Sequence, residues 1–128
     1  MVETITHIGI CVNSIDETLA QWTSAFGASV VKAKRKFPGQ ISCLIKLGDA
    51  FIELMEPDGD GVVRKYLETN GEGLHHLSFQ VNNFDEDCTR FEQCGMSLIR
   101  FPGNSAFIKP KGNHGLLCEI SGGNMNDI

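Results

Sequence analysis

The sequence lacks several patterns that would assign it to a specialised class of protein. None of its apolar runs approaches the ~20 residues of a membrane span, and residues 1–4 have neither the basic region nor the apolar core of a signal peptide. The five cysteines are odd in number and include no C-x-x-C pair, which argues against a disulfide framework or a thiolate zinc site. We therefore expect a cytoplasmic protein with no membrane partner, whose cysteines are small buried hydrophobic residues.

The chain also lacks an excess of positive charge. Its formal net charge is −5, whereas duplex binding depends on a basic surface that neutralises phosphates. We therefore expect no nucleic-acid partner. The basic residues are nevertheless unevenly distributed, and either a solvated strand edge or an anion-binding lip would explain the two groups, Lys32, Lys34, Arg35 and Lys36 in the first and Lys109 and Lys111 in the second.

An internal repeat is the most informative feature that is present. His7 in residues 5–13 and His76 in residues 74–82 hold the same place in two copies of one pattern, offset by 69 positions (76 minus 7). Glu53 and Glu119 correspond in the same way, with an offset of 66 (119 minus 53). Each half of the chain therefore carries one histidine and one glutamate on strands that alternate apolar and polar residues.

Each copy predicts the same series of elements. A capped helix follows each first strand, with Ser14 and Glu17 or Asn83 and Glu86 at the spacing of a capping box. Three strand candidates follow each helix, at residues 30–34, 41–47 and 51–55 in the first half and 97–100, 106–109 and 116–120 in the second. The sequence thus predicts a single α+β domain of two tandem βαβββ modules forming a curled mixed sheet around a metal site, with module one at about 1–58, a connector helix at about 59–72 and module two at about 73–122.

The two glutamates indicate a site, because a carboxylate in an apolar strand is costly unless it is paired or coordinated. If two curled sheets close on each other, His7, Glu53, His76 and Glu119 converge on one cavity. Imidazole and carboxylate donors without a thiolate suit one divalent metal ion, such as Co²⁺, Ni²⁺, Mn²⁺, Fe²⁺ or Zn²⁺. We therefore predict that these four residues are metal ligands.

The residues around these positions carry a family resemblance. Residues 7–9, 52–54, 65–77 and 109–120 resemble the vicinal oxygen chelate superfamily of glyoxalases, bleomycin-resistance proteins and dioxygenases, and within it the methylmalonyl-CoA epimerases. This resemblance implies the same four ligands, with Glu119 also acting as the acid/base carboxylate and His75 outside the ligand set. It further implies a small-molecule thioester substrate, linked to CoA, and a homodimer.

One segment departs from the epimerase pattern. Epimerases of this family resemble one another in carrying a second catalytic glutamate before the third strand, whereas residues 34–40 contain no carboxylate here. Glu56, Glu72 and His114 are the alternative candidates for a second base. The leading hypothesis is metal-dependent epimerisation of an acyl-CoA such as methylmalonyl-CoA by α-proton transfer. A glyoxalase I-like lactoylglutathione lyase and a non-catalytic small-molecule-binding member of the superfamily are the alternatives.

Overall fold

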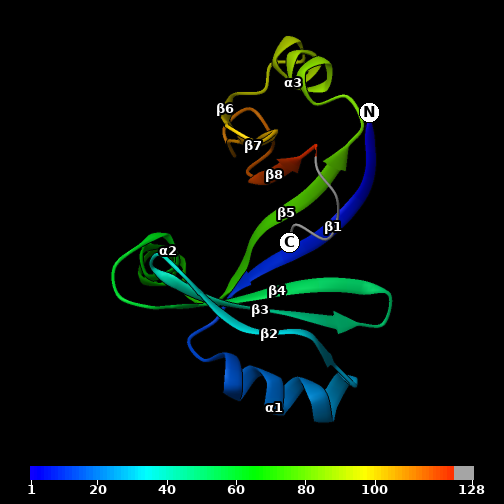
Figure 1. Ribbon diagram of the computed structural model, residues 1–128. Coiled ribbons are helices and arrows are strands. Elements are labelled where there is room, and N and C mark those ends of the chain that lie inside the picture. The colour runs from blue at the N-terminus through cyan, green and yellow to red at the C-terminus, as the bar shows by residue number, and fades with distance from the viewer. Residues whose placement is uncertain (123–128) are drawn as a thin grey trace. The chain divides into compact units, whose positions relative to one another are not determined.

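A computed structural model of the chain describes residues 1–122. Within this part of the chain the βαβββ series occurs twice, which confirms the predicted α+β class (Figure 1). The elements are β1 (Val2–Cys11), α1 (Ile15–Phe26), β2 (Ser29–Phe37), β3 (Gln40–Leu47), β4 (Ala50–Pro57), α2 (Val62–Asn70), β5 (Gly73–Val81), α3 (Phe84–Gln93), β6 (Leu98–Phe101), β7 (Ser105–Ile108) and β8 (Cys118–Ser121).

The chain divides into two compact units. The first, His7–His75, is called the His7 unit below, and the second joins Met1–Thr6 to the chain from His76 onward and is called the His76 unit. Helix α2 falls where the connector helix is predicted. Among residues 1–122, no helix has the length and apolar character needed to cross a membrane.

In the His7 unit, the strand order is β2-β3-β4-β1. Strands β2, β3 and β4 are antiparallel neighbours, and β4 pairs in parallel with β1. One face of this sheet packs against α1, as Figure 1 shows, because alternate residues are apolar and meet the apolar side of the helix. Its core residues are Val12, Ile15, Ala28, Cys43, Ile45, Ile52 and Leu54. His7 and Glu53 lie on the opposite face.

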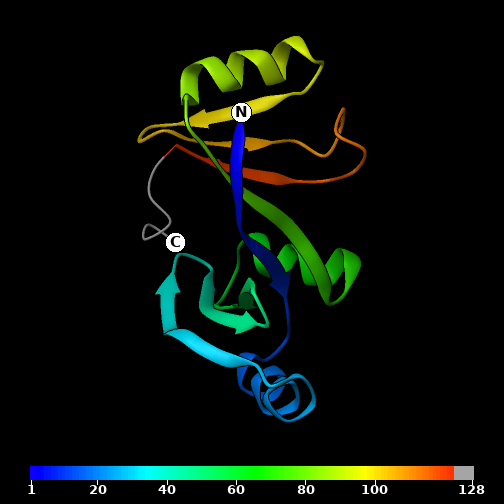
Figure 2. The ribbon, with the colours of Figure 1, turned by 90° about the vertical axis from the view of Figure 1, so that its right-hand side faces the viewer.

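The His76 unit repeats this plan. Strand β5 pairs in parallel with β8, which continues through antiparallel pairs to β7 and β6. Figure 2 shows α3 lying along this sheet, where it covers the face formed by Val81, Phe84, Cys88, Ala106, Ile108, Cys118 and Ile120. The predicted alternation on the last strand is confirmed, because Cys118 and Ile120 are buried in this core and Glu119 is on the other face.

The two helix starts differ from each other. Ser14 caps α1 as predicted, with its side chain accepting a hydrogen bond from the Glu17 N–H at 3.1 Å. The predicted capping box at Asn83 is wrong, because its side chain makes no capping hydrogen bond and its N–H instead donates to Asp87 Oδ2 at 3.1 Å. Burial alone would raise the pKa of Asp87, but hydrogen bonds from the Met1 amine, Arg90 and the Asn83 N–H outweigh it and lower that pKa to about 2.

The strand boundaries differ most at β2, which was predicted to end at Lys34 and continues to Phe37. Phe37 pairs with Gln40 across a two-residue turn, and Gly39 supplies the positive φ of 80° that this turn needs. In the second half, β8 begins at Cys118 and not at Leu116. Residues 34–40, which contain no carboxylate, therefore form the tip of a β-hairpin.

The buried cysteines generate the first prediction. Cys11, Cys43, Cys88 and Cys118 are buried, whereas the expectation of burial is wrong for Cys94, which is exposed at the end of α3. Under native conditions a thiol reagent should modify one thiol per chain, and all five after unfolding in guanidinium. A Cys94→Ser variant is the control and should give no fast reaction. Rapid modification of two or more thiols in the native wild type would contradict the predicted burial.

Candidate metal centre

His7 and Glu53 form one imidazole–carboxylate pair in the His7 unit. The parallel register of β1 and β4 sets Gly9 opposite Glu53, and His7 lies two residues before Gly9 on the same face. His7 Nε2 is 3.5 Å from Glu53 Oε1. The imidazole is 3% exposed and the carboxylate 20%, so the pair has a buried nitrogen donor beside a carboxylate that still reaches the surface.

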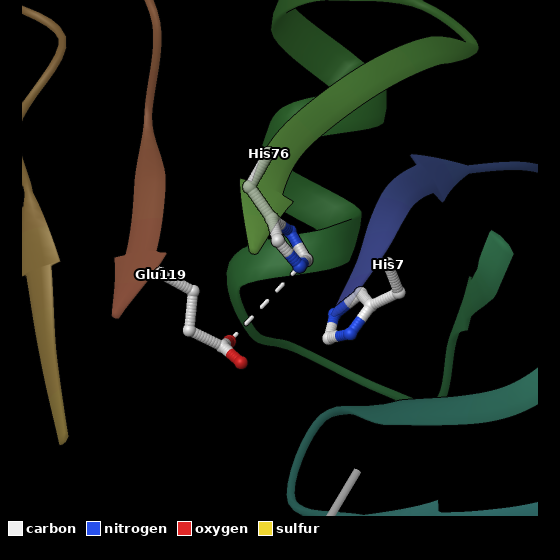
Figure 3. A group of neighbouring side chains, drawn as sticks. All are labelled: His7, His76 and Glu119. Carbon is white, nitrogen blue, oxygen red and sulfur yellow. Dashed lines mark ion pairs between the residues drawn. The ribbon is translucent and has the colours of Figure 1, made fainter. Parts of the chain in front are cut away.

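His76 and Glu119 form the equivalent pair in the His76 unit. The parallel register of β5 and β8 sets Ser78 opposite Glu119, two residues after His76. Figure 3 shows His76 and Glu119 pointing toward one another, with His76 Nε2 4.0 Å from Glu119 Oε2. The Ser78 hydroxyl donates a weak hydrogen bond to Glu119 Oε1 at 3.4 Å. The sequence pattern predicts no role for Ser78, although strand alternation places it on the polar face with His76.

Most of the chain is similar to one known protein family. Residues 6–109 match the Glyoxalase/Bleomycin resistance protein/Dioxygenase superfamily. The chain belongs to this superfamily. The predicted resemblance to the vicinal oxygen chelate superfamily is thereby confirmed. The two βαβββ series form the fold of this chain, and each series contains one histidine–glutamate pair.

Three relatives refine this placement within the superfamily. The chain is 30% identical over 123 residues to the uncharacterized Bacillus subtilis protein YqjC, covering 89% of this chain and 88% of that protein. It is 28% identical over 132 residues to the ethylmalonyl-CoA/methylmalonyl-CoA epimerase of Cereibacter sphaeroides, covering 94% and 98%. Its structure matches that of Streptomyces coelicolor methylmalonyl-CoA epimerase in complex with 2-nitronate-propionyl-CoA, with a TM-score of 0.79, 28% identity and coverage of 96% and 100%. The chain is thus related to isomerases.

Two neighbours of the glutamate Glu53 have altered proton affinities. Burial, together with the negative charge of Glu53, raises the pKa of the Cys11 thiol to about 11, so this thiol is protonated at neutral pH. Burial lowers the pKa of His75, against the opposing effect of Glu53. The His75 ring packs edge-on against Tyr66 of α2, with centroids 5.0 Å apart. The donor set on this face therefore consists of imidazole and carboxylate, without a thiolate.

Two of the three alternative bases have structural roles at the start of α1. The Ile15 N–H donates to Glu56 Oε1 at 2.9 Å, and the Asn13 N–H donates to Glu72 Oε2 at 2.8 Å. Glu56 alternates with Ile52 and Leu54, so it shares the face that packs on α1 and not the face of Glu53. Glu56 therefore satisfies the first N–H group of α1, whereas Glu72 accepts from the residue just before the N-cap Ser14. His114 lies exposed in a left-handed turn before β8.

This capping role predicts how substitution of Glu56 changes the stability of the protein. Glu56→Ala removes a charged acceptor from a helix N-terminus and should lower the free energy of unfolding by about 0.5–2 kcal/mol. Urea unfolding followed by circular dichroism measures this change. Glu68→Ala, at an exposed position of α2, is the control and should stay within about 0.5 kcal/mol of wild type. A Glu56→Ala variant of wild-type stability that has lost activity would instead support Glu56 as the second base.

Proposed function

We propose that the protein is a divalent-metal-dependent epimerase that acts by α-proton transfer on an acyl-CoA thioester such as methylmalonyl-CoA. The observation that carries this proposal is the recurrence of one imidazole–carboxylate pair in each module, His7 with Glu53 and His76 with Glu119. The similarity to two methylmalonyl-CoA epimerases over nearly the whole chain supports the choice of reaction.

In this proposal, His7, Glu53, His76 and Glu119 bind one divalent ion. Their chemistry fits such an ion, because each pair combines a buried imidazole with a partly exposed carboxylate and the nearby Cys11 thiol is protonated. Co²⁺, Ni²⁺, Mn²⁺, Fe²⁺ and Zn²⁺ all accept these donors. When bound, the ion supplies positive charge that stabilises an enolate oxygen.

Glu119 is the residue that moves the α-proton in this proposal. Its carboxylate is 34% exposed, more than that of Glu53, so it is the more accessible of the two to a substrate. The Ser78 hydroxyl, which donates to Oε1, orients the carboxylate on β8. Glu56 and Glu72 accept backbone N–H groups at and just before the start of α1, so neither is proposed as a second carboxylate beside Glu119. We therefore expect proton exchange on one face of the substrate to outpace inversion.

The remaining expectations extend the same proposal. The substrate is a small-molecule thioester on a CoA carrier, as the names of the two epimerase relatives suggest. A homodimer, a cytoplasmic location and the folding of both modules as one vicinal-oxygen-chelate domain are proposed with it. Size-exclusion chromatography with light scattering tests the homodimer.

One observation favours a second candidate, a glyoxalase I-like lactoylglutathione lyase. The hairpin tip at residues 34–40, where the resemblance to epimerases places a second glutamate, contains no carboxylate and turns through Pro38 and Gly39. A lyase that uses the same metal ligands and Glu119 does not need that carboxylate. A non-catalytic small-molecule-binding member of the superfamily is the third candidate, and the presence of all four ligand-type residues argues against it.

The metal proposal predicts the behaviour of a His76→Ala variant. Metal content after dialysis should fall, and the affinity for the metal should drop by more than about tenfold. Loss of a residue that only hydrogen-bonds to a metal ligand already lowers metal affinity by about 10–100-fold. The rise in Tm that added Co²⁺ or Ni²⁺ gives the wild type should also disappear, because a bound ion stabilises the folded state. His114→Asn is the control, since asparagine tolerates the left-handed turn there. Unchanged metal stoichiometry in His76→Ala would remove His76 from the ligand set.

The catalytic proposal predicts the behaviour of Glu119→Gln. Glutamine keeps an oxygen donor but not the base, so this variant should lose about 100–10,000-fold in α-proton exchange while keeping much of its metal. Nuclear magnetic resonance of methylmalonyl-CoA in deuterated water measures exchange, and a chiral assay measures inversion. Glu68→Gln is the matched control. Full exchange by Glu119→Gln would refute its role, and no exchange by the metal-loaded wild type, with turnover of a hemithioacetal, would favour the lyase.

A further inference from the structure

The two modules match at their proposed ligands but differ in chemistry at their outermost strands. In the His7 unit, the registers of β1, β4, β3 and β2 place residues in rows that cross the sheet on the face of Glu53. The row through the glutamate reads Gly9, Glu53, Leu44 and Lys32. The next row reads Cys11, Met55, Ser42 and Arg35. Both rows therefore end in a cation on β2.

The corresponding rows of the His76 unit end in apolar residues. The row through the glutamate reads Ser78, Glu119, Phe107 and Ile99, and the next reads Gln80, Ser121, Ser105 and Phe101. Ile99 and Phe101 are 44% and 43% exposed, and the Phe101 ring packs edge-on against Phe107 with centroids 5.6 Å apart. Lys32 and Arg35 thus occupy the places that Ile99 and Phe101 hold in the other module.

The basic cluster of β2 is divided between two faces. Lys34 lies on the α1 face, where its Nζ is 2.9 Å from Asp16 Oδ1, and Lys36 pairs with Ile41 on the same face. Lys32 and Arg35 pair with Leu44 and Ser42 on the opposite face, a pattern that the register shifts of β2 between residues 30 and 35 make possible. Charged side chains protect an exposed edge strand whichever face they lie on. The face on which they lie therefore distinguishes Lys32 and Arg35 from Lys34 and Lys36.

We propose that Lys32 and Arg35 bind an anionic group of the substrate and so determine its specificity. Neighbouring strands lie about 4.8 Å apart, so the backbone of Lys32, two strands from Glu53, is about 10 Å from it. A long cationic side chain there reaches a group a few bonds from an atom held beside Glu53. Arg35 stacks on the ring of Phe37, 5.3 Å from its centroid, which holds the guanidinium on this face.

This inference rests on the proposed function for its substrate class, an acyl thioester. Two parts of such a molecule carry negative charge, namely a carboxylate on the acyl group and the phosphates of the CoA carrier. Both accept charge-assisted hydrogen bonds from lysine and arginine, and arginine donates two such bonds in parallel. Two cations on one face of this hairpin favour a substrate that is anionic at this point.

The test is binding by the metal-loaded protein, measured by isothermal titration calorimetry. The variant Lys32→Met/Arg35→Met keeps the length of both side chains and removes both charges. The control Lys34→Met/Lys36→Met removes two charges from the other face of the same strand. The probes are methylmalonyl-CoA and propionyl-CoA, which lacks the acyl carboxylate. We expect the first variant to bind methylmalonyl-CoA about 10–100-fold more weakly and the control within about threefold of wild type.

The two probes separate the sources of the anion. A loss confined to methylmalonyl-CoA assigns the cations to the acyl carboxylate, whereas an equal loss for both probes assigns them to the carrier phosphates. Binding of both probes at wild-type strength by Lys32→Met/Arg35→Met, equal losses in the control variant, or no binding by the wild type would overturn the inference. Metal content should be unchanged in all variants. The binding readout is independent of proton exchange, so dependence on Lys32 and Arg35 without exchange would refute the epimerase alone.

Discussion

Parallel pairing of the first and last strands in each module is the constraint on which the candidate centre depends. Parallel neighbours carry residues in the same direction, so the register that sets Gly9 opposite Glu53 also brings His7 to that glutamate. The pairing of Ser78 with Glu119 does the same for His76. A shift of one residue in either register would turn the carboxylate toward the helix-covered core. The apolar residues that alternate with the candidate ligands therefore position them, because burying those residues fixes the register.

The two faces of each sheet carry different residues, with an apolar core on one face and an imidazole–carboxylate pair on the other. In the His7 unit, α1 covers one face, Glu56 satisfies the N–H of its first residue, and Glu72 satisfies the N–H of Asn13 just before it. These carboxylates belong to the fold. The opposite face carries Glu53 and the β2 cations Lys32 and Arg35. Glu56, although close in sequence to Glu53, therefore lies on the face that packs against α1.

The two modules share their candidate metal-binding residues and differ at their edge strands. Both halves retain a histidine, a glutamate and a helix on the far face, but one edge strand presents Lys32 and Arg35 where the other presents Ile99 and Phe101. One half thus offers charge and the other apolar surface.

The sequence by itself determined the two modules, the parity of their strands and the four ligand-type residues, because hydrophobic alternation and helix caps are local signals that an internal repeat doubles. Only the tertiary structure decided which groups meet. The contact of Asp87 with the Met1 amine, the hydrogen bond from the first residue of α1 to Glu56, and the sorting of Lys32 and Arg35 from Lys34 all depend on contacts between residues far apart in sequence or on strand bulges. Such contacts follow from how strands pair in three dimensions, which no local pattern in the chain records.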